Sequence, residues 1–566
     1  VADTGLGDGT PAGAHPDIPA GRIVQILDYS YPDAPSCYYV VEDGPQDVDS
    51  GHGTHCSGSV LSDGDDATGI GKGVAPAARL VFQAVEEYLD FVRGCSRQYE
   101  DGYWLFGIPD DIRDLFQDAY DLGARIHSNS WGHDAAGDYD LDAANADDFV
   151  WNHPDFVITT SAGNAGVDAN ANGIVDSDSM GSPATAKNII TVGASENDRQ
   201  NYYPCDNGLT YTSHDAYQTG VTCLDMGGNQ VDYLGTWGSR YGDSFTAEPL
   251  YSDGTAGNQE QMASWSSRGP TDDGRVKPDV VAPGTWILSA ASGMYQEGYG
   301  DPVNPANGLY QWDGWGMPAS ETYKYMGGTS MSNPLVAGGA TVVRDYFFKA
   351  HSHNASAALV KAALINSADD LLDENNDGQD DNDYPIPNVH EGWGRVNLVT
   401  ATSGNAQFVD EAAGVSTGGT DSYSFAVASA GQPFKVSLAW SDYPSTESAS
   451  TNLVKAVLQA RMGYHCEIEV MRADRMWEAV AEGRVDATGS AWLPKTHEHF
   501  YRQYKDRVTN LGPNLEGART GLVVPRVTVG RKTGPSGKRN EPYITIESIP
   551  ELAGEEEKFR RRIVGI

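Results

Sequence analysis

Ser330 is the residue whose surroundings most favour chemistry. It follows Gly327-Gly328-Thr329 and opens an apolar run with helical spacing, which predicts a helix over Ser330–Lys349. Pro334 is expected in the first turn of this helix, where its missing N–H is harmless. Free backbone N–H groups and the positive end of the helix dipole lie at such a start, and both suit a nucleophile that generates an oxyanion. The alternative is that Ser330 only caps the helix.

Three further motifs supply the partners that a serine nucleophile needs. His52 lies between two glycines at another predicted helix start, in SGHGTH (50–55), where no adjacent side chain gives it a packing role. Asp3 ends an apolar strand just before a Thr-Gly turn and could orient the imidazole. Asn164, in SAGNAG (161–166), follows another strand and could donate its amide to an oxyanion. Each motif taken alone is also typical of a tight turn.

Asp28 is the alternative to Asp3 as the orienting acid. It also ends an apolar strand before His52, in the sequence Ile26-Leu27-Asp28-Tyr29. It lacks the Thr-Gly turn, and Tyr29 is bulky where a tight turn is expected, so Asp3 is the preferred candidate.

Alternating strand-like and helix-like runs from Val1 to about Thr402 must position these residues. Such alternation predicts an α/β domain over 1–402 with a parallel sheet covered by helices on both faces. Residues 203–258 are polar and rich in Tyr and Gly, which predicts a surface insertion. The expected strands are Gly21–Leu27, Arg79–Ala84, Arg125–Ser128, Phe156–Thr160, Ile189–Val192 and Val280–Ala282, and the expected helices are Gly53–Leu61, Pro109–Leu122, Tyr139–Asn152, Ser330–Lys349 and Ala355–Asn366.

The order Asp…His…Asn…Ser on these glycine-rich motifs resembles the subtilisin family of serine proteases, over residues 1 to about 451. The similarity is greatest to its oxidatively stable alkaline branch, whose members carry a C-terminal β-sandwich. A subtilisin-like three-layer α/β/α fold is therefore expected. The segments that carry the resemblance are VADTGL (1–6), GHGTHCSGSVL (51–61), GARIHSNSWG (123–132), SAGNAG (161–166), ATAKNIITVGASE (184–196), SSRGPTDDGRVKPDVVAPGT (266–285), MGGTSMSNP (326–334) and GWGRVNL (392–398).

The resemblance implies an endopeptidase that cleaves proteins or peptides through an acyl-enzyme intermediate. It implies a triad of Asp3, His52 and Ser330, with Asn164 as oxyanion donor. It implies that the edge Ser130-Trp131-Gly132 pairs with the substrate backbone as one wall of the primary specificity pocket, and that Gly163 helps to floor that pocket. Structural calcium and no organic cofactor are expected on the same ground.

Two loops rich in Asp and Asn are candidate calcium sites. Oxygen donors at alternate positions around a glycine turn are typical of calcium loops. Neither loop has the distal Glu of a complete EF-hand, and chance acidic clusters are common in so acidic a chain. The candidate ligands are Asp168, Asn170, Asn172 and Asp176 in the first loop and Asp373, Asn375 and Asp377 in the second, where Asp380 and Asp381 follow.

The net charge of −41 is unevenly distributed. Residues 452–566 hold 19 Lys and Arg against 15 Asp and Glu, whereas residues 1–451 hold 19 against 64. Scattered acids suit a halophilic protein, because high salt screens their repulsion, and they argue against nucleic-acid binding. No apolar run reaches the roughly 18 residues of a membrane span. An extracellular protein of a high-salt environment is expected.

The six cysteines allow one or two disulfides, which would fit an extracellular protein. Cys205 and Cys223 flank a polar segment and could close one loop. Cys37 with Cys95 is a weaker alternative pair. Cys56 follows the HGTH motif and is expected to be a free, buried thiol.

The pattern changes twice beyond residue 402. Residues 403–453 favour short alternating strands, Ser422–Val427 and Phe434–Trp440, which predict part of a β-sandwich. Residues 454–566 resemble a fragment of the glycine betaine/proline receptors of ABC transporters, on segments such as KAVLQARMGYHCEIEV (455–470) and MWEAVAEGRVDATGSAWLP (476–494). Those receptors hold a quaternary amine in an aromatic cage. Trp492 is the best cage candidate, although it could equally be a core residue.

Both pieces are expected to be incomplete, so the chain is predicted to be a chimera with a partial α/β receptor lobe that does not bind betaine. The chain opens on Val1-Ala2-Asp3, which predicts an N-terminally truncated domain whose frayed first strand would hold Asp3 poorly. The alternative functions are an inactive fusion that carries the receptor fragment and a non-catalytic scaffold for binding.

Overall fold

A computed structural model describes the chain in two compact units, Val1–Asp442 and Tyr443–Ile566. Each unit has its own sheet and helices. Side chains and backbone are described for residues 1–41, 44–65, 69–92, 95–198, 235–294, 322–404, 406–410, 435–439, 476–485 and 500–509, and the backbone alone for 210–211, 221–222, 317–318, 467–470, 473–475, 487–492, 498–499, 510–513, 520–525 and 562–565.

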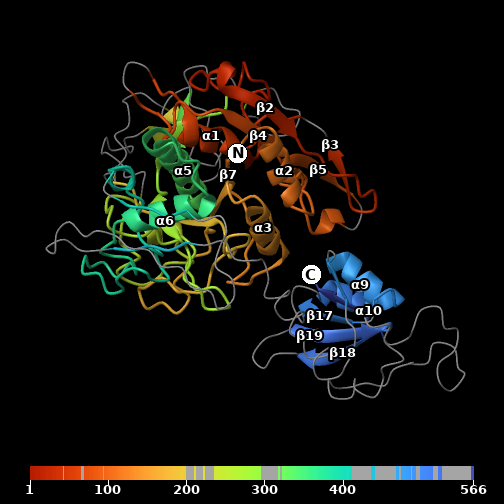
Figure 1. The fold of residues 1–566 in the computed structure, drawn as a ribbon. Coiled ribbons are helices and arrows are strands. Elements are labelled where there is room, and N and C mark those ends of the chain that lie inside the picture. The colour runs from red at the N-terminus through yellow and green to blue at the C-terminus, as the bar shows by residue number, and fades with distance from the viewer. Residues whose placement is uncertain are drawn as a thin grey trace, which may run out of the picture. The chain divides into compact units, whose positions relative to one another are not determined.

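A seven-stranded parallel sheet forms the centre of the first unit (Figure 1). β1 (Ala2–Asp3) lies in its interior, between β4 (Leu80–Ala84) and β7 (Ile126–Asn129). The predicted parallel α/β sheet is thereby confirmed. The strand order is β12-β9-β8-β7-β1-β4-β2, and the remaining strands are β2 (Ile23–Asp28), β8 (Val157–Ser161), β9 (Ile190–Ser195) and β12 (Val280–Pro283).

Helices cover both faces of this sheet, as predicted. α1 (His52–Leu61) packs on α5 (Thr329–His351), and α5 crosses β7, β8, β9 and β12. α2 (Arg113–Asp121) packs on α3 (Leu141–Asn152) at the opposite face (Figure 1). Two further helices, α6 (Ala357–Ser367) and α7 (Leu398–Ala401), pack on α5. Every residue of β4, β8 and β9 is buried, as expected for parallel strands covered on both faces.

Gly53 lets α1 approach the turn that follows β1. A Cβ on Gly53 would lie 2.3 Å from the carbonyl oxygen of Gly5, which is closer than any real contact. The small residue therefore sets the distance between β1, which carries Asp3, and the helix that begins with His52.

The first strand is not frayed, so this prediction is wrong. The amino group of Val1 donates to the carbonyl of Val81, and Gln83 N–H donates to the carbonyl of Val1. On the other side, the indole of Trp131 donates to the carbonyl of Ala2 at 3.1 Å. Because neighbours hold β1 on both sides, Asp3 is fixed and only 2% exposed.

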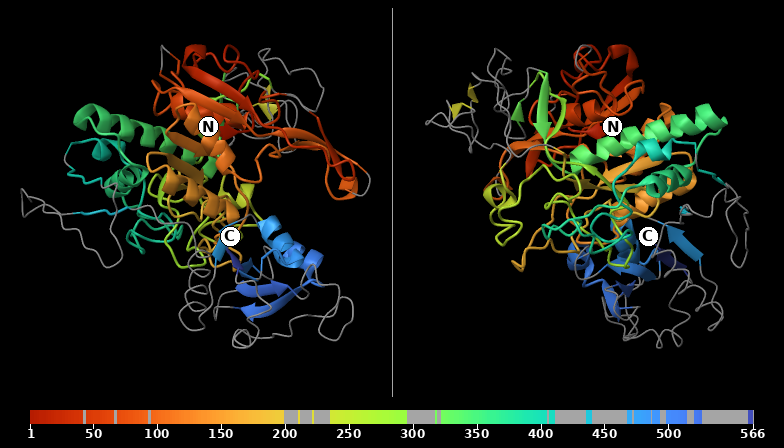
Figure 2. Two further views of the ribbon diagram at one scale, coloured as in Figure 1. Left: turned by 45° about the vertical axis from the view of Figure 1, so that its right-hand side comes forward. Right: turned by 90° about the vertical axis from the view of Figure 1, so that its left-hand side faces the viewer.

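Two three-stranded antiparallel sheets were not predicted from the sequence. β5 (Glu87–Phe91) pairs with β3 (Tyr38–Val41) and β6 (Gly102–Trp104) at the periphery of the first unit (Figure 2). The Cys37–Cys95 disulfide, the weaker of the two predicted pairs, ties this sheet together. The second sheet comprises β13 (Ile287–Ala290), β14 (Met317–Pro318) and β15 (Tyr323–Met326).

The predicted surface insertion over 203–258 is only partly a surface segment. Its last part contains α4 (Trp237–Arg240), and Trp237, Phe245 and Leu250 are completely buried against Trp265. These apolar residues are separated by polar and Gly-rich sequence, which hid their contribution to the core. Cys205 and Cys223 lie outside the described residues, where only β10 (Thr210–Tyr211) and β11 (Val221–Thr222) are placed.

The predicted β-sandwich strand Phe434–Trp440 does not form in its described part, residues 435–439. Lys435 Nζ instead donates to the carbonyl of Ile365, and Ser437 Oγ accepts from the side chain of Asn366. This segment therefore lies along the end of α6 and not in a sheet. The other expected strand, Ser422–Val427, lies outside the described residues.

The second unit has a mixed five-stranded sheet with the order β16-β20-β17-β19-β18. β16 (Glu467–Val470) lies at one edge of this sheet. Met476, Trp477 and Val480 of α9 (Ala473–Glu482) form its core with Val508, beside α10 (Glu498–Tyr504). The other strands are β17 (Ala487–Trp492), β18 (Val508–Pro513), β19 (Thr520–Pro525) and β20 (Arg562–Gly565). A search of the described helices finds none with the length and apolarity of a membrane span.

Candidate active site

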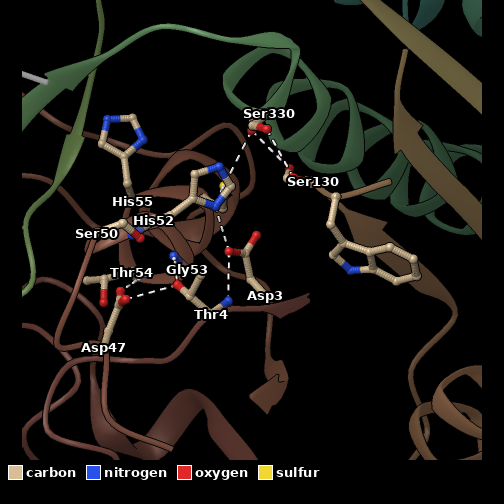
Figure 3. A network of polar contacts seen from close by, with 12 residues as sticks. Asp3, Thr4, Asp47, Ser50, His52, Gly53, Thr54, His55, Ser130 and Ser330 are labelled. Atoms are coloured by element: carbon tan, nitrogen blue, oxygen red, sulfur yellow. Dashed lines mark hydrogen bonds and ion pairs between the residues drawn. The ribbon is translucent and has the colours of Figure 1, made fainter. Parts of the chain in front are cut away.

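Asp3, which is buried at the carboxyl end of β1, forms a pair with the partly exposed His52. Asp3 Oδ1 lies 2.6 Å from His52 Nδ1, and 18% of the His52 side chain is exposed. Burial alone would lower the pKa of His52, but the charge and hydrogen bond of Asp3, together with the neighbouring Cys56 thiol, outweigh burial and hold the pKa well above its usual value. Since Nδ1 faces Asp3, Nε2 is the nitrogen left to face a reacting group. Figure 3 shows the imidazole between Asp3 and Ser330.

Ser330 is the second residue of α5, because the helix begins at Thr329, one residue earlier than predicted. The cap position is held by Gly328, so the alternative role of Ser330 as a helix cap is excluded. Pro334 consequently lies in the second turn and not in the first, which corrects the prediction. An N–H at position 334 would bond the carbonyl of Ser330, and proline removes it.

Ser130 hydrogen-bonds both the hydroxyl and the carbonyl of Ser330. Ser130 Oγ donates to the carbonyl of Ser330 at 2.9 Å, and Ser330 Oγ donates to the carbonyl of Ser130 at 3.0 Å (Figure 3). The thiol of Cys56, free and buried as predicted, also donates to the carbonyl of Ser330 at 3.3 Å. The hydroxyl must turn from Ser130 toward His52 before it can transfer its proton, and catalytic hydrogen bonds commonly tighten only when substrate is bound.

The side-chain nitrogen of Asn164 and the backbone nitrogen of Ser330 lie beside the same point at Gly328. The Asn164 side-chain oxygen accepts from Thr329 N–H and from Thr329 Oγ1, both at 2.9 Å, so its Nδ2 is left to donate elsewhere. A Cβ on Gly328 would lie 3.6 Å from Ser330 N and 3.7 Å from Asn164 Nδ2. Two donors around one point are the arrangement that stabilises an oxyanion.

The segment Ser130-Trp131-Gly132 follows β7 and lies beside Ser330, but the Trp131 side chain points into the core. It is 7% exposed, with its indole on Ala2. Gly132 is exposed, and none of the described residues hydrogen-bonds the backbone of Trp131 or Gly132. This backbone is therefore available to an added strand.

Gly163 requires glycine. Its φ of +105° is one that other residues rarely adopt, and a Cβ would meet Ser267 Oγ at 2.8 Å. Its N–H donates to Thr329 Oγ1 at 3.3 Å, which ties the loop after β8 to the start of α5.

Asp28, the alternative orienting acid, and His55, the second histidine of HGTH, lie away from the reacting groups. Asp28 is exposed at the end of the edge strand β2, and β4 separates β2 from β1. His55 is completely buried, and its Nε2 lies 3.0 Å from the carbonyl of Ile287. Burial lowers the pKa of His55 to about 3, so it is a neutral structural residue.

Thr4 and Asp47 are the polar residues around this pair that the sequence reasoning missed. Thr4 N–H donates to Asp3 Oδ1, and Thr4 Oγ1 donates to Asp47 Oδ1, each at 2.9 Å. The available signals were the Thr that follows Asp3 directly and an acid five residues before His52.

The two candidate calcium loops differ. In the first, Asp168 accepts from Asn172 and Gly173 N–H, and Asp176 accepts from Ala169 N–H and the Asn170 amide. The loop thus uses its own carboxylates, and the Asn172 side-chain oxygen accepts from Ile174 N–H.

In the second loop, Asp377, Asp381 and Asp383 bring carboxylate oxygens within 4.8 Å of one another, as a cation would require. Asp373 accepts from the N–H of Gly378 in the same loop and is 1% exposed, and burial raises its pKa to about 7. The Asn375 amide donates to Asp383, so Asn375 supports this group from the side. The structure therefore favours the second loop, brings Asp381 into its carboxylate group and adds Asp383 to the candidates.

In the second unit, the backbone of Trp492 pairs with Thr520, and the side chain of Trp492 lies outside the described residues. The role of Trp492 in an aromatic cage stays a prediction.

Comparison with known proteins assigns both parts of the chain. Residues 435–566 match the model of the substrate binding domain of the ABC-type glycine betaine transport system, a match that begins earlier than residue 454. Over 81 residues the chain is 43% identical to the glycine betaine/carnitine transport binding protein GbuC of Listeria monocytogenes, covering 14% of this chain and 27% of that protein.

The first part is similar to known serine proteases. It is 30% identical over 361 residues to the serine protease/ABC transporter B family protein tagD of Dictyostelium discoideum, covering 57% of this chain and 18% of tagD. It is 26% identical over 417 residues to the serine protease AprX of Bacillus subtilis, covering 71% of this chain and 65% of AprX. The chain thus spans less than a fifth of tagD. Residues 1–394 match the subtilase family model, and because this match covers more than half of the chain, the protein belongs to the subtilase family of serine proteases.

Proposed function

We propose that this chain is an endopeptidase that cleaves peptide bonds through Asp3, His52 and Ser330. The observation that carries the proposal is the 2.6 Å contact of Asp3 with His52, which directs the other imidazole nitrogen toward Ser330 (Figure 3). Ser330 Oγ attacks the scissile carbonyl while His52 takes its proton, and Asp3 stabilises the imidazolium. His52 then protonates the leaving amine, and water releases the acyl group by the same steps in reverse.

The oxyanion of each tetrahedral intermediate is stabilised by Ser330 N–H and Asn164 Nδ2. The substrate binds in extended form along 130–132, and Gly163 forms part of the floor under its side chain. Unfolded segments and mobile loops of proteins are the substrates that fit, because a bound strand must leave its own fold to pair with this edge.

Secretion into a salty medium belongs to the same proposal. Residues 1–451 hold 64 acidic but only 19 basic residues. Such a surface favours a high-salt environment, where the repulsion between the acids is screened. The Cys37–Cys95 disulfide favours an oxidising compartment. Placement in the oxidatively stable alkaline branch rests on the sequence resemblance alone.

A fluorophosphonate probe tests the catalytic assignment. The full chain should be labelled at Ser330, with more labelling at high than at low NaCl, and the Ser330→Ala variant should not be labelled. Labelling of a different residue would refute the assignment. No labelling at any salt concentration would favour a non-catalytic scaffold or an inactive fusion.

We also propose a structural calcium ion in the second acidic loop, bound by Asp377, Asp381 and Asp383. EDTA should lower the Tm by a few degrees, since an ion that binds only the folded state stabilises it. The double variant Asp381→Asn/Asp383→Asn should no longer respond to EDTA, whereas Asp176→Asn in the first loop should respond like the unmodified chain. An equal response in all three proteins would refute this location, and no response in the unmodified chain would refute the ion.

For residues 435–566 we propose no betaine binding by this chain, because the identity with GbuC extends over only 27% of that receptor. Tryptophan fluorescence should stay unchanged when glycine betaine is added. Saturable quenching would show that the receptor part retains its ligand.

A further inference from the structure

The first turn of α1 has no cap of its own. Its cap residue, Gly51, has a left-handed backbone with φ +69° and no side chain to accept a hydrogen bond. The first N–H groups of any helix lack partners inside the helix and must find acceptors elsewhere. Three side chains accept them here: Ser50 Oγ from His52 N–H at 3.2 Å, Thr4 Oγ1 from Gly53 N–H at 2.9 Å and Asp47 Oδ2 from Thr54 N–H at 2.8 Å.

Thr4 joins the two halves of the Asp3–His52 pair. Its N–H donates to Asp3 Oδ1, the same oxygen that contacts His52. Its hydroxyl accepts from Gly53, the residue next to His52 in α1 (Figure 3). One residue thereby fixes the carboxylate and the helix that carries the imidazole.

Asp47 determines the direction of the Thr4 hydroxyl. An ionised carboxylate only accepts hydrogen bonds, so the Thr4 proton points to Asp47 Oδ1 and a lone pair remains for Gly53. Asp47 is completely buried, and its negative charge is favourable at the N-terminal end of α1. Its backbone is held as well, because Ser292 Oγ donates to its carbonyl at 2.6 Å and its N–H donates to Gly7.

We propose that Thr4 and Asp47 are positioning residues for the proposed catalytic pair, and that they keep His52 Nδ1 on Asp3 by holding the first turn of α1 against the end of β1. The inference rests on the proposed function. Neither residue touches the reacting atoms, so their effect must appear in the position and the pKa of His52.

Three variants separate positioning from simple stability. Thr4→Val removes the hydroxyl at nearly constant volume, Thr4→Ser restores a hydroxyl, and Asp47→Asn puts an amide donor where one of two acceptors is needed. Asp63→Asn is the matched control, because it also removes one acid beside α1, at its far end, where Asp63 pairs with Arg22. The readouts are Tm, kcat and KM on a peptide substrate, and the pH profile of kcat/KM.

Thr4→Val and Asp47→Asn should lower kcat about 10- to 100-fold with little change in KM, because a small misplacement of a catalytic group has effects of this size. The acid limb of the profile should move to lower pH, because a loosened contact with Asp3 raises the pKa of His52 less. Thr4→Ser should have a kcat and an acid limb close to those of the unmodified chain. Asp63→Asn should have the same values as the unmodified chain.

The proposal is overturned if Thr4→Val and Asp47→Asn fold and keep the kcat and acid limb of the unmodified chain, or if Thr4→Ser loses as much as Thr4→Val. If Thr4→Val does not fold, the kcat and pH profile of Asp47→Asn alone test the proposal. If Asp47→Asn does not fold, those of Thr4→Val alone test it. The unmodified chain is tested first with the fluorophosphonate probe. Failure there refutes the proposed function, whereas failure of the variants in an active protein refutes only the positioning role.

Discussion

Two helices meet at the candidate active site, and their N-terminal ends are built differently. In α1, which begins with His52, all three first-turn N–H groups are accepted by side chains of Ser50, Thr4 and Asp47. In α5, Thr329 N–H is accepted by Asn164 and Met331 N–H by the carbonyl of Gly328. No residue in the described part of the chain accepts the N–H of Ser330 between them.

The difference follows the different tasks of the two residues. A base must keep one orientation while its charge changes, so a helix end with every donor satisfied suits His52. A nucleophile needs a donor that is already in place when the oxyanion forms, and a donor with no partner in the resting state does not have to be released first. The chain thus has one closed and one open helix end within a single site.

The largest effect on the open end is expected from Asn164. Asn164→Asp keeps an acceptor for Thr329 but loses the N–H donor, so kcat should fall about 10²- to 10³-fold or more while Tm and KM change little. Asn164→Ala should lower kcat similarly and also lower Tm, because Thr329 loses its acceptor. Steady-state kinetics and calorimetry on both variants would distinguish the two functions of this side chain. A kcat near that of the unmodified chain in Asn164→Asp would show that the open end is not used.

A smaller effect is expected from Ser130→Ala. The carbonyl of Ser330 would lose the Ser130 hydroxyl that donates to it at 2.9 Å, and we expect about a tenfold lower kcat. Pro334→Ala restores a backbone N–H four residues after Ser330, so the double variant should recover part of the loss. If the losses of the two single variants simply add in the double variant, the N–H at position 334 does not replace the Ser130 hydroxyl as the donor to the Ser330 carbonyl.

The pH profile tests the closed end. Catalysis needs neutral His52, and Asp3 holds the pKa of His52 well above its usual value of about 6.5. The kcat/KM should therefore fall as the pH drops through a value above about 6.5. An acid limb below that value would show that Asp3 does not stabilise the imidazolium in the active protein.

The smallest effect concerns the stability contributed by Asp47. Burial raises its pKa to about 6, so the folded chain binds this proton more tightly than the unfolded chain. The contribution of Asp47 to the free energy of unfolding is greatest below pH 3.8, the pKa of its carboxyl in the unfolded chain, and is lost as the pH rises toward 6. Between about pH 4 and 6 the stability of the unmodified chain should fall relative to that of Asp47→Asn, by a few degrees in Tm. Curves of Tm against pH that run parallel for the two proteins would contradict a raised pKa of Asp47.

The sequence predicted what depends on local pattern. Buried strands such as β8 are short runs of β-branched residues, helices such as α5 have apolar residues at helical spacing, and glycine-rich motifs mark the strand and helix ends that carry Asp3, His52, Asn164 and Ser330. Family resemblance then assigned their roles. The geometry adds the pairing of Asp3 with His52 and the convergence of Asn164 with the Ser330 N–H.

What could not be predicted depends on contacts between distant segments. β1 has two residues and looked frayed, because the strands and the Trp131 indole that hold it come from far along the chain. Asp47 looked like one acid among many, since its contact with Thr4 spans 43 residues. Trp237 looked like part of a polar insertion until its neighbours in the core were known.

Gly53 has a consequence for mutational tolerance. The space for its side chain is filled by the carbonyl of Gly5, so each of the other amino acids would push α1 away from β1. A saturation library at position 53, screened for proteolysis, should therefore return only variants with glycine, even though residue 53 takes no part in the reaction. Selection at this position would act on a distance and not on a chemical property.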